Sequence, residues 1–177
     1  MKYFTPSLYA RLQDHAPDAM DAADAAWEDA AERYDNYLQT VLPDLPPSAR
    51  QLLEDYYLHD AEVLSAVCQN DTFVIVLQLD APPNDLLYIT YTLTAEPLID
   101  RSALPAEYCS PRMTWQYEEL EVCGSGDVRH YRHSILFSNG WEIQVPFRDV
   151  RLAAVRPIYP YPRTAVCSSM TNTPQVT

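Results

Sequence analysis

Glycine and long apolar runs are both scarce in this chain. The sequence has only 3 glycines against 15 prolines in 177 residues. It contains no G-x-S-x-G nucleophile elbow and no glycine-rich phosphate loop, so we predict neither a serine hydrolase nor a bound cofactor. No apolar run reaches the ~18 residues that a membrane-spanning helix needs. We therefore expect no membrane partner.

Basic residues are scarce in the first part of the chain. Residues 1–100 hold 18 Asp and Glu but only four Lys and Arg, whereas residues 101–177 hold 7 acids and 8 arginines. A net charge of −13 repels nucleic acid and favours a basic protein partner or a cation. A solvated acidic surface without any partner is the simpler interpretation of the same bias.

Paired cysteine motifs are absent as well. None of the cysteines forms a C-x-x-C pair, and Pro6 and Arg11 interrupt any apolar export signal near the N-terminus. The sequence therefore predicts reduced thiols and a cytoplasmic location. The cysteines are Cys68, Cys109, Cys123 and Cys167.

Helical patterns occupy residues 1–57. Thr5 followed by Pro6 is typical of a helix start, and it predicts a short helix to about residue 13. Residues 18–42 show apolar side chains at three- and four-residue steps, which predicts one long amphipathic helix. A shorter helix is expected from residue 47 to about residue 56.

The other side of the long helix carries an acidic stripe with a single base, Arg33, on the same helix. Like charges at this spacing cost a few tenths of a kcal/mol each, so the pattern indicates a surface for a basic partner. A solvated face is the alternative. The stripe consists of Asp21, Asp24, Glu28, Glu32 and Asp35.

The remainder of the chain has the alternation of β-strands. We predict strands at residues 58–67, 72–79, 86–93, 114–122, 128–137 and 141–152, with an irregular connection over 96–111. Asn139-Gly140 predicts a type I′ hairpin turn, and Pro146 requires an edge position or a bulge.

These patterns predict an α+β fold in which N-terminal helices pack on one face of a six-stranded, mainly antiparallel sheet. Residues 1–155 form the single domain, with a helical part at 1–57 and a sheet part at 58–155. Residues 156–177 are expected to form an extended tail rich in Pro and Tyr.

Two short motifs carry a resemblance. The opening MKYFTP, then Leu8-Tyr9 and an acidic helix, and finally Leu58-His59-Asp60-Ala61 at the start of a sheet resemble an uncharacterised family of small bacterial proteins. This resemblance implies a bacterial origin and no particular activity. The architecture is also similar to that of β-rich immunity proteins of bacterial toxin systems, which implies an inhibitor of a toxin.

His59, Asp60 and Glu62 form the one arrangement that suggests metal chemistry, because imidazole and carboxylate suit Zn, Mn or Fe. A further ligand would have to come from His130 or His133 in the fifth strand. The alternative, which we favour, is structural: Asp60 accepts backbone hydrogen bonds where the helical part meets the sheet.

The polar strand around His130 and His133 is expected to form a solvated face that balances the acidic half, in preference to an anion or peptide surface. Two function classes remain open. The first is a non-enzymatic interaction protein, immunity-like or inhibitor-like, that presents the acidic helix face to a basic partner. The alternative is a small metal-assisted hydrolase that uses His59, Asp60 and Glu62. The sequence favours the first, because it does not show convergent ligands.

Overall fold

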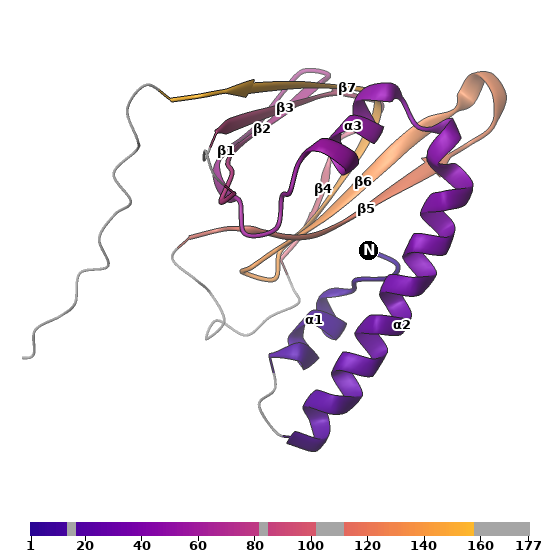
Figure 1. The fold of residues 1–177 in the computed structure, drawn as a ribbon. Coiled ribbons are helices and arrows are strands. Elements are labelled where there is room, and N and C mark those ends of the chain that lie inside the picture. Colours follow the sequence, from indigo (N-terminus) through magenta and orange to yellow (C-terminus); the bar gives the residue numbers. More distant parts are fainter. Residues whose placement is uncertain (14–16, 82–84, 102–111, 158–177) are drawn as a thin grey trace, which may run out of the picture.

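The computed structural model describes residues 1–13, 17–81, 85–101 and 112–157 (Figure 1). The described helices all precede the sheet: α1 (Pro6–Leu12), α2 (Pro17–Val41) and α3 (Pro47–Asp55). The strands are β1 (Glu62–Gln69), β2 (Thr72–Gln78), β3 (Leu86–Leu93), β4 (Leu98–Asp100), β5 (Trp115–Cys123), β6 (His130–Phe137) and β7 (Glu142–Val155). Short 3₁₀ turns lie at Leu42–Asp44 and Gly126–Val128.

The strands form one antiparallel sheet in the order β1-β2-β3-β7-β6-β5, with β4 added beside β7. The sheet curls until its two outer strands meet at one end. There the backbone N–H of Asp60 donates to the carbonyl of Trp115 at 2.8 Å, and Trp115 N–H donates to Ala61 at 2.9 Å. The predicted α+β class, with helices before a mainly antiparallel sheet, is confirmed.

The core lies on the inner side of the curled sheet. Alternate residues of β2 point inward, and each of these buried side chains pairs with a buried neighbour on β3, such as Ile75 with Ile89 and Leu77 with Leu87. Helix α3 covers this side and contributes Leu52, which is fully buried. Burial of this size stabilises the fold by about 2 kcal/mol per large aliphatic side chain.

Helix α2 stands at the side of the sheet rather than over the core, with α1 beside its lower half (Figure 1). The predicted start of α1 is confirmed: the hydroxyl of Thr5 accepts the N–H of Leu8 at 3.2 Å, and Pro6 opens the helix. Aromatic rings join α2 to β5, among them Trp27 and Tyr117 with ring centres 4.3 Å apart. None of the described helices is long and apolar enough to cross a membrane.

Three local predictions differ from the structure. The first strand begins at Glu62 rather than at residue 58, because Asp60 has a φ of 65° and turns the chain. The short strand β4 lies inside the connection that we expected to be irregular. At Asn139-Gly140 the type I′ prediction is wrong: only Gly140 has a positive φ (75°). Its N–H bonds to the carbonyl of Phe137, so the loop is a type I turn followed by a glycine bulge.

Other expectations fall on residues outside the described ranges. These are the extended tail beyond residue 157 and the thiols of Cys109 and Cys167. The two described cysteines, Cys68 and Cys123, are free thiols.

Candidate functional site

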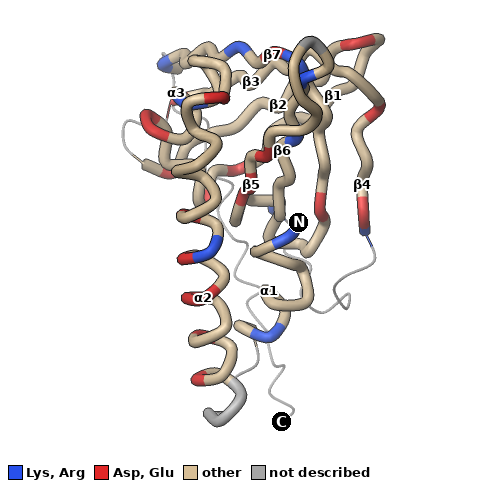
Figure 2. Tube along the Cα trace, turned by 90° about the vertical axis from the view of Figure 1, so that its right-hand side faces the viewer, with Lys and Arg blue, Asp and Glu red and all other residues tan. Residues whose placement is uncertain are grey.

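The acidic stripe lies on the outer side of α2 (Figure 2). All five predicted carboxylates are exposed. The base of this helix, Arg33, pairs with Asp29 at 3.0 Å and not with a member of the stripe. Within the described part of the chain, none of the five forms an ion pair. Among the described residues, the stripe is therefore a run of negative charge without a compensating base.

The stripe ends at a cleft of about 350 Å³, which opens between α2, the segment after α3, and β5. Asp35 of the stripe lines it, and so does His59 from the proposed metal set. The described lining residues include no lysine and no arginine. Half of the described lining residues are aromatic: Phe4, Tyr34, Tyr56, Tyr57, Trp115 and Tyr117.

Two of the residues that line the cleft carry buried polar atoms without a hydrogen-bond partner. Trp115 is 1% exposed, and its Nε1–H has no partner in the described structure. Glu118 also lines the cleft, with a side chain that is 20% exposed, while its buried Oε2 makes no hydrogen bond. Unsatisfied buried polar atoms are costly, so a polar group that reached Trp115 Nε1–H or Glu118 Oε2 would gain a hydrogen bond.

Behind Glu118 lies a buried histidine. His133 Nε2 is 3.4 Å from Glu118 Oε2 without forming a hydrogen bond, and His133 Nδ1 is 2.8 Å from the Tyr91 hydroxyl. Burial raises the pKa of Tyr91 well above its usual value, and the charge of Glu118 raises it further. Tyr91 therefore keeps its proton, and its hydroxyl holds the imidazole in place next to Glu118.

The hydroxyl of Tyr34 connects α2 to β5 at the wall of the cleft. It accepts the backbone N–H of Leu120 at 2.7 Å. Burial raises the pKa of Tyr34 far above 10, and the carboxylates of Glu118 and Glu119 oppose ionisation further. The phenol therefore keeps a proton that it can donate.

The other two residues of the proposed metal set face a second, smaller pocket. Asp60 and Glu62 line a pocket of about 130 Å³ together with Asp80 and Arg112. Arg112 lies 3.9 Å from a carboxylate oxygen of Glu62. Here the chain supplies its own cation to the carboxylates.

The structure thus distributes His59, Asp60 and Glu62 between two neighbouring pockets. His59 Nδ1 lies 3.1 Å from Asp60 Oδ2 without forming a hydrogen bond. The other Asp60 oxygen accepts from the side chain of Gln116 at 3.1 Å, where we had expected a backbone donor. No group of three or more His, Cys, Asp or Glu side chains suited to a metal ion occurs among the described residues.

The polar strand of the sequence analysis is only partly a solvated face. His130 is half-buried, and its Nδ1 lies 3.1 Å from the carbonyl of Val128. His133 is 0% exposed, so the expectation of a solvated histidine there is wrong. The curl of the sheet turns this position inward against Tyr91 and Trp115. Alternation within one strand could not show which side the curl would enclose.

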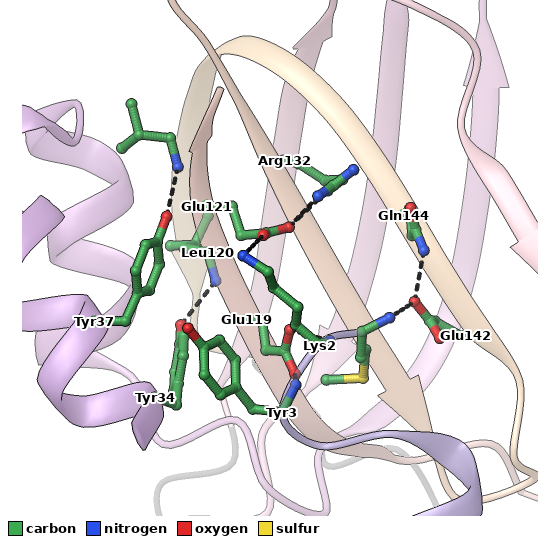
Figure 3. A network of polar contacts seen from close by, with 12 residues as sticks. Lys2, Tyr3, Tyr34, Tyr37, Glu119, Leu120, Glu121, Arg132, Glu142 and Gln144 are labelled. Atoms are coloured by element: carbon green, nitrogen blue, oxygen red, sulfur yellow. Dashed lines mark hydrogen bonds and ion pairs between the residues drawn. The ribbon is translucent and has the colours of Figure 1, made fainter. Parts of the chain in front are cut away.

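A second group of carboxylates escaped the sequence analysis (Figure 3). Glu119, on β5, accepts the backbone N–H groups of Lys2, Tyr3 and Phe4, each at 2.7 Å. Glu121 accepts from the Nε of Arg132 at 2.7 Å and pairs with Lys2. The only sequence signal is three glutamates within four residues of a strand, which we had left uninterpreted.

No protein-family model matches the chain, and no curated protein matches it at a significant level. What the protein does is therefore inferred from its charged helix and from the cleft where that helix meets the sheet.

Proposed function

We propose that this chain is a non-enzymatic interaction protein that binds a basic protein partner, in the manner of an immunity protein or an inhibitor. The observation that carries the proposal is the uncompensated stripe on α2. Its five carboxylates are exposed and lie on one rigid helix, in a chain with a net charge of −13.

The charge of the stripe attracts an oppositely charged partner before the two molecules are in contact. A surface of one sign raises the rate at which an oppositely charged partner associates, and it rejects partners of the same sign. Because the stripe runs along a helix, its charges have a fixed spacing, which favours a partner with a matching row of lysines or arginines. The interaction should weaken as salt is added, since these charges are solvent-exposed.

The proposal includes a bacterial, cytoplasmic setting. The resemblance of the opening MKYFTP and of Leu58-His59-Asp60-Ala61 to small bacterial proteins supports the origin. The free thiols of Cys68 and Cys123 support a reducing compartment.

The test compares two variants with the same net charge. In the stripe variant, Asp21→Asn, Asp24→Asn, Glu28→Gln and Glu32→Gln remove four charges from α2 but leave Asp35 in the cleft. The control variant removes four charges away from α2, from α3, β7 and two connections between strands, through Glu54→Gln, Asp71→Asn, Glu96→Gln and Asp149→Asn. Both are titrated calorimetrically with a peptide of alternating arginine and serine.

The stripe variant should bind the peptide about tenfold more weakly than the parent, because exposed ion pairs contribute about 0.2–1 kcal/mol each. The control variant should bind nearly as well as the parent. Equal losses in the two variants would show that net charge alone attracts the peptide. A parent that fails to bind the peptide at low salt would overturn the proposed function.

A further inference from the structure

The chemistry of the cleft specifies more than a basic partner. We infer that the cleft between α2 and β5 receives the guanidinium group of one arginine side chain from that partner. The inference rests on the proposed function and names the group that the partner inserts.

Charge is the first reason. Asp35 and Glu118 both line the cleft, and the described lining residues include no lysine and no arginine that could pair with them. A carboxylate withdrawn from water needs hydrogen-bond donors or an opposite charge. Glu118 has His133 near one oxygen but lacks a hydrogen bond there, and its side chain remains 20% exposed toward the cleft. A cation that enters the cleft would complete its coordination.

The smaller pocket beside the cleft provides an internal comparison. There Asp60 and Glu62 share their pocket with Arg112, whose guanidinium comes from the chain itself. The cleft has a similar pair of carboxylates, Asp35 and Glu118, without such an arginine. The comparison therefore favours a guanidinium group, like that of Arg112 in the smaller pocket, as the group that pairs with the carboxylates of the cleft.

The aromatic wall is the second reason, and it favours arginine over lysine. A guanidinium is planar, stacks on aromatic faces and is weakly hydrated, whereas an ammonium keeps its water more strongly. Tyr56, Tyr57 and Tyr117 offer rings at the cleft, and Tyr57 is 67% exposed at its mouth. A planar fork between such rings can also reach a carboxylate with two N–H groups.

The third reason is independent of charge. Trp115 lines the cleft with its ring almost fully buried, and its Nε1–H has no partner. The lining residues therefore include an unused donor, Trp115 Nε1–H, and an acceptor without a hydrogen bond, Glu118 Oε2. An arginine residue in a peptide brings the complement of both, because it carries guanidinium donors and backbone carbonyl acceptors.

The experiment measures binding of the arginine–serine peptide, a lysine–serine peptide and a citrulline–serine peptide to the full chain. Citrulline keeps the shape of arginine without its charge. The parent should prefer arginine over lysine and should bind the citrulline peptide least. Glu118→Gln should weaken arginine binding by about tenfold and abolish the preference over lysine.

Circular dichroism shows whether the Glu118→Gln variant is folded. Two further variants test the cleft even if it is not. Tyr57→Ala removes an exposed ring from the mouth and should weaken arginine binding severalfold. Tyr88→Ala removes a partly exposed ring from β3, away from the cleft, and should leave binding unchanged. The inference would be overturned if a folded Glu118→Gln variant and Tyr57→Ala both bound the arginine peptide as tightly as the parent does. This holds even if the stripe variant loses binding as the proposed function predicts.

A single-residue probe separates the cleft from the stripe. Trp27→Phe and Trp141→Phe leave Trp115 as the only tryptophan. N-acetyl-arginine amide should then change the Trp115 fluorescence, both in this background and when the stripe is neutralised as well. Citrulline amide should leave the Trp115 fluorescence unchanged. This result would support the cleft even if the stripe failed its own test. Equal responses to both probes would overturn the arginine assignment.

Discussion

Carboxylates on α2 and carboxylates on β5 behave in opposite ways. The five carboxylates of the acidic stripe are exposed and leave their charge to solvent. Glu119 and Glu121 of β5 are buried. Glu119 accepts hydrogen bonds from the opening residues of the chain, and Glu121 accepts one from Arg132. The same functional group thus forms a charged surface where water reaches it and supports the architecture where it is buried.

Glu118 falls between these two groups. It belongs to β5 and approaches a buried histidine, yet it retains access to the cleft and an oxygen without a hydrogen bond. Its neighbours Glu119 and Glu121 point to the other side of the strand, where the N-terminal segment meets them (Figure 3). Alternation along one strand therefore separates a structural pair of glutamates from the one that is available for binding.

The largest expected effect comes from removing a structural carboxylate. Glu119→Ala should lower the free energy of unfolding by about 3 kcal/mol or more, because three backbone N–H groups lose their acceptor in a buried place. Glu32→Gln, on the stripe, should change the same quantity by less than about 0.5 kcal/mol. Urea unfolding of both variants measures the contrast, and similar losses would remove the distinction between the two groups of carboxylates.

The link between α2 and β5 predicts a dependence on alkaline pH. Tyr34 has a raised pKa in the folded state, first because of its burial, so the folded protein holds a proton that the unfolded chain releases near pH 10. Stability from this group is therefore complete below pH 10 and decreases as the pH rises further.

Tyr34→Phe should make the decrease above pH 10 less steep. At neutral pH it should cost about 1–2 kcal/mol, because the N–H of Leu120 loses its acceptor. Denaturant unfolding at a series of pH values measures both effects. A variant with the same alkaline slope as the parent would contradict the role given to Tyr34.

The smallest effect concerns Asp60, whose backbone turns the chain at the start of β1. Asp60→Ala should cost about 1 kcal/mol, since alanine tolerates a φ of 65° less well than aspartate does. Asp60→Asn should cost less, because asparagine also accepts this conformation. Thermal melts should show the same losses with and without Zn²⁺ or Mn²⁺. A metal-dependent rise of the parent's melting temperature that both variants lack would restore the metal-site hypothesis.

Local patterns predicted the helices and strands well, and they failed where distant parts of the chain meet. The Thr5-Pro6 start is a matter of neighbouring residues, and it was predicted correctly. Asn139-Gly140 was assigned the wrong turn, because the pairing of Phe137 with Trp141 sets the loop length at three residues. The start of β1 was misplaced because Asp60 bonds to Trp115, more than fifty residues away.

The sequence predicted the part of the candidate site that lies on one helix, but not the part that depends on contacts between distant segments. The acidic stripe follows from the spacing of charges on one helix, so Asp35 was found in advance. Glu118 and Trp115 meet His133 through the register of β5 against β6, and an irregularity in β5 between Trp115 and Tyr117 shifts Trp115 relative to Glu118. Their separate positions in the sequence carry no sign of this meeting.

The anchoring of the first residues on Glu119 has a consequence for how the protein is made. The hydrogen bonds from Lys2, Tyr3 and Phe4 span 115 to 117 residues of sequence. On a ribosome the opening segment leaves the exit tunnel long before β5 exists, so the contacts of α2 and of the opening residues with β5 are missing during most of translation. Contacts of such long range also close slowly. We therefore expect the nascent chain to remain unfinished until its last strands emerge, and then to fold in one late step.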